Sequence, residues 1–150
     1  MNSWIIAARP QTLIASIAPV AVSTCLCVFF GFFNFYIFIT TLLTAILLQI
    51  LANYINDLYD YKKGTDNKDR IGPKRVVQSG LLSIQKIKKG ILVIILLCLI
   101  MGLYLVIKGG IPILIIGLTS FIFTYLYTAT SFAIAYNGLG EIFVILYFGI

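Results

Sequence analysis

Four long stretches without a charged residue dominate the chain and cover residues 12–33, 35–56, 90–107 and 111–128. A helix of about 20 apolar residues crosses the roughly 30 Å hydrocarbon core of a bilayer. Of all residues, 61% are apolar and only 11% are charged, whereas soluble domains carry about 25% charged residues. The sequence therefore predicts an all-α, polytopic transmembrane helical bundle and excludes a soluble globular protein.

The last apolar run, residues 142–150, has only nine residues. As a helix it would extend roughly 13 Å, at about 1.5 Å per residue, which is too short to cross the membrane. We therefore expect four full spans and a truncated fifth, with residues 1–150 forming part of a single domain. A re-entrant or interfacial fifth segment is the alternative.

The charged residues are concentrated in one part of the chain. Nine of the eleven Lys and Arg residues lie between Lys62 and Lys89, and all four aspartates lie between Asp57 and Asp69. Basic residues favour the cytoplasmic side of a membrane, so the loop 61–89 and the N-terminus are predicted to be cytoplasmic. Because the positive charge is not spread over a surface, no nucleic-acid partner is expected.

A polar stripe runs along the end of the second apolar stretch. At the helical period its five side chains share an arc of about 100°, and both aspartates lie near a helix C-terminus, where the macrodipole disfavours negative charge. A frayed helix end with a solvated acidic edge is one interpretation. The other is a site for a hard divalent cation such as Mg²⁺, which prefers oxygen ligands; the chain has no histidine. The stripe comprises Gln49, Asn53, Asn56, Asp57 and Asp60.

A mixed acidic and basic segment follows the stripe. Carboxylates can hold a metal while Arg and Lys side chains neutralise the remaining oxygens of a bound diphosphate. Beside apolar spans, such a site favours an amphipathic substrate with a long apolar tail. The segment contains Lys62, Lys63, Asp66, Lys68, Asp69, Arg70, Lys74 and Arg75.

Several strings of this chain resemble one known family. Residues 53–61, Asn-Tyr-Ile-Asn-Asp-Leu-Tyr-Asp-Tyr, are similar to the first aspartate-rich motif of the UbiA-type membrane prenyltransferases, Asn-x-x-x-Asp-x-x-Asp. Other strings resemble its naphthoate branch, which acts in menaquinone synthesis. The resemblance implies a larger bundle, of which this chain is the N-terminal part, with a second aspartate-rich motif on a later helix. These other strings are residues 8–12, 63–66, 70–75, 78–80, 127–128 and 136–141.

The resemblance also implies a reaction. The family would bind a polyprenyl diphosphate through Mg²⁺, ionise it to an allylic cation and alkylate an aromatic ring. In the naphthoate branch the acceptor is 1,4-dihydroxy-2-naphthoate, which loses its carboxylate as CO₂ and gives demethylmenaquinone. Such an enzyme would be a multi-pass protein of the bacterial cytoplasmic membrane.

Site residues follow from the matching positions. Asp57 and Asp60 are the expected catalytic residues, and the metal ligands would be Asn53, Asp57, Asp60 and Asp66, although Asp66 could instead order the loop. The diphosphate would be held by Arg70, Lys74, Arg75 and Arg9, of which Arg9 could instead be an interfacial arginine. Tyr127 and Tyr136 are candidates for the aromatic pocket.

Two alternatives stay open at this point. The chain could be an inactive or split-gene fragment of such an enzyme, because it ends before the second acidic motif. Less in keeping with the motifs, it could be a cation-conducting membrane protein that uses the stripe at residues 49–60 as an ion path.

Overall fold

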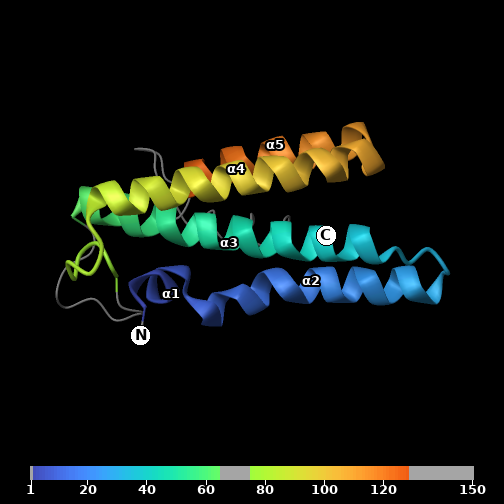
Figure 1. The fold of residues 1–150 in the computed structure, drawn as a ribbon, viewed down its shortest axis with the longest axis horizontal. Helices are drawn as coiled ribbons and strands as arrows, with labels where there is room; N and C mark the ends of the chain where they lie inside the picture. Colours follow the sequence, from blue (N-terminus) through green and yellow to red (C-terminus); the bar gives the residue numbers. More distant parts are fainter. Residues whose placement is uncertain (1, 65–74, 129–150) are drawn as a thin grey trace.

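The computed structural model describes residues 2–64 and 75–128, and these residues form helices without any strand. In Figure 1, α3 lies between α2 and α4, with α5 beside α4, and α3 contacts each of the other helices. Consecutive long helices run antiparallel, so α1, the end of α3 and the start of α4 lie at the same end of the bundle. The helices are α1 (Ser3–Ala8), α2 (Pro10–Phe29), α3 (Phe35–Lys63), α4 (Ile84–Gly109) and α5 (Ile111–Thr128).

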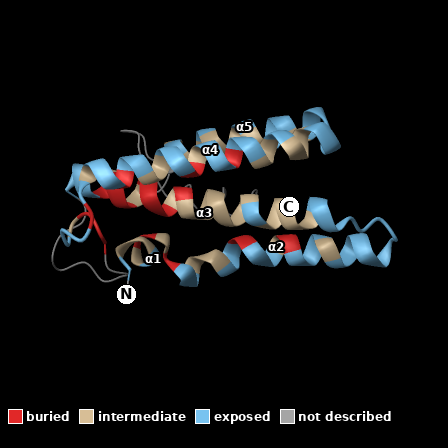
Figure 2. Ribbon diagram, in the orientation of Figure 1, coloured by how far each residue is buried: buried red, intermediate tan, exposed pale blue. Residues whose placement is uncertain are grey.

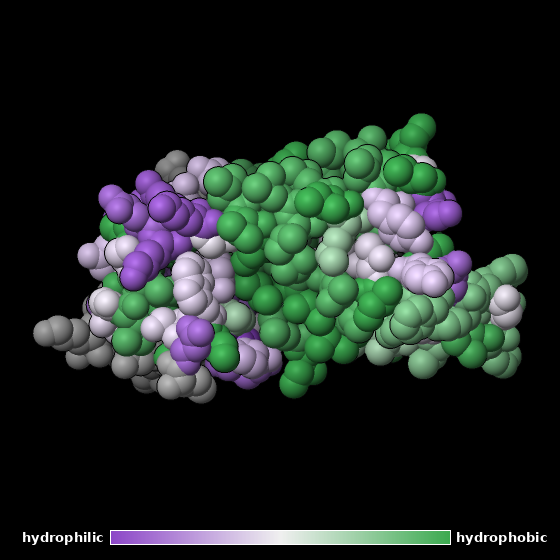
Figure 3. Space-filling model, viewed as in Figure 1, coloured by the Kyte–Doolittle hydropathy of each residue, from purple (hydrophilic) through white to green (hydrophobic). Residues whose placement is uncertain are grey.

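The helices have the length and surface of membrane spans. Within the described residues, α2, α3 and α4 are long and apolar enough to cross a bilayer, and α5 is a shorter apolar helix. On the face that Figure 3 shows, a broad apolar band crosses the middle of the bundle, with the largest hydrophilic patch at one end. Large apolar side chains such as Phe29 and Ile107 are mostly exposed, at 81% and 72%. The prediction of a polytopic helical membrane protein is confirmed.

Capping residues explain where the helices begin and end. The Asn34 side chain accepts hydrogen bonds from the backbone N–H groups of Tyr36 and Ile37, at 3.0 and 3.1 Å, which satisfies N–H groups left free at a helix start. At the other end of α3, Gly64 has a φ of 69°, a left-handed conformation that glycine adopts without strain.

The predicted loop 61–89 is too long at both ends. Residues 61–63 belong to α3 and residues 84–89 belong to α4. The Ser83 side chain caps α4 by accepting from the N–H of Lys86 at 3.3 Å. A serine cap and a run of good helix formers thus start α4 before its charges end, which is why the change from charged to apolar residues did not mark the boundary.

The beginning of the chain also differs from the expected single span. α2 starts at Pro10 and continues through Pro19, and a separate short helix, α1, precedes it. Between them Arg9 has φ 50° and ψ 71°, and it is the one non-glycine residue with positive φ among the described residues. Proline at the first helical position costs no hydrogen bond, so a new helix starts directly after this corner.

Burial is concentrated at one end of the bundle. Figure 2 shows the buried positions gathered at the C-terminal end of α3, next to α1, the segment before α4 and the start of α4. Here α3 is buried on its polar and apolar sides alike: Leu51, Tyr54 and Leu58 are 1%, 6% and 3% exposed. Three members of the polar stripe, Asn53, Asp57 and Asp60, are buried there as well.

Candidate functional site

Three segments that are distant in sequence meet at the polar end of α3. The stripe on α3 faces the corner between α1 and α2 and the returning segment that starts at residue 75. Opposite charges from these segments face each other away from water. The five charged or polar side chains concerned are all nearly buried: Arg9 is 8% exposed, Asn53 4%, Asp57 0%, Asp60 8% and Arg75 5%.

Asp57 occupies the centre of this group. Its Oδ2 accepts a hydrogen bond from the backbone N–H of Val76, and its Oδ1 accepts from the N–H of Val77, both at 3.0 Å. The guanidinium of Arg9 approaches the same carboxylate, with Nη2 3.9 Å from Oδ2. A buried carboxylate is strongly unfavourable unless it is hydrogen-bonded and faces a positive charge, and here it has both. Asp57 therefore fixes the backbone that follows Arg75.

Asp60 lies one turn further along α3 and pairs with Arg75. The Nη2 of Arg75 donates to Oδ2 of Asp60 in a buried ion pair. Arg75 immediately precedes the two N–H groups that bind Asp57, so the two aspartates hold adjacent parts of one segment. The following turn is closed by hydrogen bonds from the Ser79 N–H and Oγ to the carbonyl of Arg75, at 3.1 and 2.6 Å. This turn positions Arg75 beside the aspartates.

Asn53 connects α3 to the corner between α1 and α2. Its Nδ2 donates to the carbonyl oxygen of Ala8 at 2.8 Å and to Oγ1 of Thr12 at 2.9 Å. A carbonyl oxygen can only accept, so the amide nitrogen must face the corner and Oδ1 faces the other way. The Nδ2 end of this amide therefore binds the corner between α1 and α2.

The structure brings together five of the predicted site residues and leaves others untested. Arg9, Asn53, Asp57, Asp60 and Arg75 converge. Gln49 and Asn56 of the stripe are half-buried. The remaining predicted residues lie outside the described part, namely Asp66, Arg70, Lys74, Tyr136 and the side chain of Tyr127, whose backbone belongs to the last turn of α5.

Two features of the site were not predicted from the sequence. One is Thr12, whose hydroxyl group contacts Asn53; it stands in the string 8–12, whose likeness to the family was the only signal available. The other is the pair of backbone N–H groups at Val76 and Val77 that bind Asp57. No side-chain pattern marks a backbone donor, so only the three-dimensional contact reveals it.

The oxygen atoms of Asp57, Asp60 and Asn53 are of the type that a hard divalent cation prefers as ligands. A carboxylate has about four lone-pair directions, and hydrogen bonds take one on each oxygen of Asp57, which leaves one on each. Asp60 and Oδ1 of Asn53 add further oxygen donors. The described residues contain no cluster of three acidic, histidine or cysteine ligands. Mg²⁺ does not require one, because it keeps several waters and shares substrate phosphates.

The same contacts disfavour an ion path along the stripe. A permeation path needs polar side chains that face water, whereas Asp57 is fully buried and both aspartates face arginine side chains. The cation-conducting alternative is therefore not favoured by the described part of the chain.

Comparisons with known proteins identify related sequences. Residues 16–150 match the UbiA prenyltransferase family. A 1,4-dihydroxy-2-naphthoate octaprenyltransferase of Escherichia coli is 37% identical, with 99% of this chain aligned to 50% of that protein. A protein of the same name from Haemophilus influenzae is 30% identical over 100% of this chain and 51% of its own length, and one from Bacillus subtilis is 30% identical over 90% and 43%.

The alignments also show the extent of the chain. It spans about half the length of the curated relatives that it matches. None of the solved structures gives a significant match. From the match over residues 16–150 and the identities above, the chain belongs to the UbiA prenyltransferase family.

Proposed function

We propose that this chain contributes the first half of the active site of a membrane prenyltransferase. The enzyme would transfer a polyprenyl group from a polyprenyl diphosphate to 1,4-dihydroxy-2-naphthoate and form the reduced, quinol form of demethylmenaquinone in menaquinone synthesis. Its location would be the bacterial cytoplasmic membrane. The observation that carries the proposal is the convergence of Arg9 and Arg75 on Asp57 and Asp60 at one polar end of an apolar helix bundle.

The arginine side chains would bind the diphosphate. Guanidinium groups form paired, charge-assisted hydrogen bonds with phosphate oxygens. In this proposal Arg9 and Arg75 exchange part of their contact with the aspartates for the diphosphate, and Arg70 and Lys74 add to the clamp. Because these charges sit in a site with little water, they stabilise the negative charge that develops on the departing diphosphate.

A divalent metal, for which we propose Mg²⁺, would be held by Asp57 and Asp60, with Asn53 and Asp66 as further ligands. When bound, it would act as a Lewis acid that neutralises the leaving diphosphate. Both carboxylates already lie at the place where the arginine side chains converge, which supports this assignment.

The transfer step then needs exclusion of water. The C–O bond to the diphosphate breaks, its electron pair leaves with the diphosphate, and an allylic cation remains. A ring carbon of the acceptor supplies the electrons for the new C–C bond. The bond between the ring and its carboxylate then breaks, its electron pair returns to the ring, and CO₂ departs. The apolar helices would enclose the prenyl tail and keep water from the cation. Tyr127 and Tyr136 are the proposed contacts to the aromatic acceptor.

The test uses the chain joined to the remaining half of the Escherichia coli relative, called here the completed enzyme. Membranes containing it are supplied with 1,4-dihydroxy-2-naphthoate, a radiolabelled polyprenyl diphosphate and Mg²⁺. We expect a prenylated, decarboxylated product that disappears with EDTA. Asp57→Ala and Asp60→Ala should abolish product without preventing membrane insertion, and near-normal turnover in either variant would contradict the proposed metal site.

A further inference from the structure

The corner between α1 and α2 has a backbone conformation that its sequence does not favour. Arg9 lies in the left-handed region, with φ 50° and ψ 71°, where the Cβ of any residue other than glycine meets the backbone. Pro10 follows directly, and a residue before proline favours an extended conformation. Such a conformation persists only when surrounding contacts hold it, and residues of this kind concentrate at functional sites.

Thr12 and Asn53 supply those contacts. The backbone N–H and the hydroxyl of Thr12 both donate to the carbonyl oxygen of Arg9, each at 2.9 Å. The same hydroxyl oxygen accepts from Nδ2 of Asn53, which also donates to the carbonyl of Ala8. Asn53 of α3 is therefore linked by hydrogen bonds to two successive backbone carbonyl groups. It binds the carbonyl of Ala8 directly and the carbonyl of Arg9 through the Thr12 hydroxyl.

The consequence of the corner is the direction of the Arg9 side chain. Figure 1 shows α1 turning away from the axis of α2 at this point. The guanidinium is directed into the protein, where it is nearly buried and lies 3.9 Å from Asp57. A long flexible side chain is thus held at the site before any substrate arrives, which lowers the entropic cost of binding.

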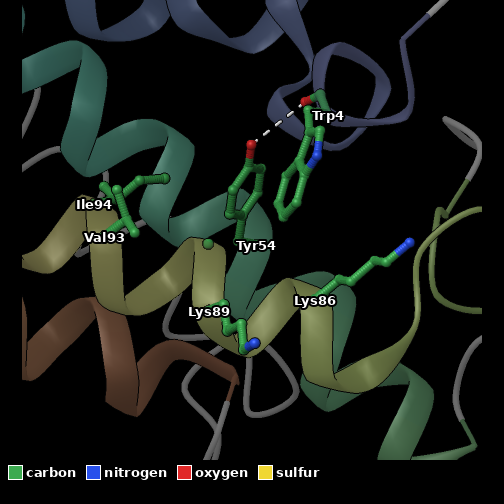
Figure 4. Close-up of a pocket in the computed structure, with 7 residues that line it drawn as sticks. Trp4, Tyr54, Lys86, Lys89, Val93 and Ile94 are labelled. Atoms are coloured by element: carbon green, nitrogen blue, oxygen red, sulfur yellow. Dashed lines mark hydrogen bonds between the residues drawn. The ribbon is translucent and has the colours of Figure 1, made fainter.

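A separate contact holds α1 itself in place. The Tyr54 hydroxyl donates to the carbonyl of Trp4 at 3.4 Å, and the two rings lie 5.7 Å apart, as Figure 4 shows beside the start of α4. Trp4 also packs against Gly90. Loosening the corner should therefore leave α1 docked, so the role of the corner can be tested separately from that of α1.

We propose that Thr12 and Asn53 are positioning residues, which hold Arg9 in its left-handed conformation and so preorganise its guanidinium for an anionic diphosphate. The identity of the diphosphate ligand rests on the proposed function. The conformation of Arg9 and its contacts with Thr12 and Asn53 do not depend on it. For Asn53 this role belongs to the Nδ2 side of the amide and is separate from metal binding by Oδ1.

Thr12→Val tests the hydroxyl, because valine keeps the shape and removes both of its hydrogen bonds. In the purified chain, we expect amide hydrogen exchange at residues 9–12 to become about tenfold faster. In the completed enzyme, we expect KM for the polyprenyl diphosphate to rise about tenfold, with a smaller change in kcat, because Arg9 binds the substrate before the chemical step. Thr12→Ser, which retains the hydroxyl, should restore both.

Thr24→Val is the matched control on α2. The hydroxyl of Thr24 donates only to Val20 within its own helix, so exchange at residues 9–12 and KM should not change. The emission of Trp4, the one tryptophan of the chain, reports whether α1 remains docked, and it should be the same in all three variants.

Asn53→Asp separates positioning from metal binding. Aspartate keeps an oxygen for a metal but has no N–H to donate to Ala8 and Thr12. A role in metal binding alone predicts a changed Mg²⁺ concentration for half-maximal activity, since a carboxylate replaces a neutral amide ligand, with unchanged exchange at residues 9–12, and that result would overturn the proposal. We expect faster exchange at residues 9–12 and a higher KM.

The two readouts must change together in the Thr12 and Asn53 variants. Faster exchange with an unchanged KM would show that the corner does not position Arg9 for binding, and a raised KM with unchanged exchange would show that the corner is not the cause. Either result would overturn the proposal. If the completed parent enzyme makes no product, the proposed function fails. Independently of that result, unchanged hydrogen exchange in Thr12→Val would overturn the claim that Thr12 holds Arg9 in its left-handed conformation.

Discussion

Replacing Asp57 by Asn should destabilise the protein more than the same change at Asp60. Asparagine has one acceptor oxygen, so one of the two N–H groups of Val76 and Val77 would meet an NH₂ group. A buried donor without a partner costs about 1–3 kcal/mol. Both substitutions also remove a negative charge beside a buried arginine, Arg9 or Arg75, and removing one partner of a buried pair costs about 3–5 kcal/mol. For Asp57→Asn we therefore expect a total of about 5 kcal/mol.

Asp60→Asn is the matched control. Its remaining oxygen can still accept from Arg75, and this side chain is 11% exposed, so only the loss of the charge beside Arg75 counts and we expect a loss of about 3 kcal/mol. For a chain of this size, 1 kcal/mol corresponds to roughly 2–4 °C in Tm. Thermal unfolding of the purified chain in detergent should therefore show Tm lowered by roughly 15 °C in Asp57→Asn and by roughly 9 °C in Asp60→Asn. Equal losses, or a larger loss at Asp60, would refute the assignment of Asp57 as the anchor of residues 76–77.

Two further substitutions test the packing and capping around the site. In Gly90→Ala the new Cβ would lie 2.6 Å from Cζ3 of Trp4 and 3.2 Å from Cε2 of Tyr54. Trp4 should therefore be displaced, and its fluorescence emission should shift. In the control Gly102→Ala, on the same helix, the new Cβ meets nothing within 4 Å, and the emission should stay unchanged. In Asn34→Ala the start of α3 loses the acceptor for two N–H groups. The free energy of unfolding should fall by about 1 kcal/mol, measured as a lower Tm. Asn34→Asp keeps an acceptor and should have a Tm close to that of the parent, and an equal loss in both variants would contradict the capping role.

The helices could be predicted largely because polar residues interrupt the apolar runs at their ends. Asn34 and the Lys108–Gly110 turn separate the apolar runs, and α3 and α5 begin at the predicted residues 35 and 111. The corner at Arg9 was not predicted, since a left-handed arginine before proline goes against local preference and depends on Asn53, which is distant in sequence. Local patterns carry no information about such a contact.

The candidate site could be predicted as a set of residues but not as a set of contacts. The period of the helix places Asn53, Asp57 and Asp60 on one face, and they do share one buried site. The sequence pattern could not indicate that Asn53 would engage the corner between α1 and α2 while both aspartates engage the segment that starts at residue 75, nor that backbone N–H groups would satisfy Asp57. These contacts require residues 9 and 75 to return to α3, which depends on how the whole bundle packs.

The proposed diphosphate site is tested most directly by removing the charge of Arg75, which pairs with Asp60, and measuring the affinity for a polyprenyl diphosphate. Binding of a radiolabelled polyprenyl diphosphate to the completed enzyme in membranes, with Mg²⁺ present, is compared between the parent and Arg75→Gln, with the matching prenyl alcohol as competitor. A charge-assisted hydrogen bond contributes about 1.5–3 kcal/mol, so Arg75→Gln should weaken diphosphate binding roughly 10- to 100-fold and leave competition by the alcohol unchanged. Equal affinity of the two proteins for the diphosphate would contradict the claim that this cluster is a diphosphate site.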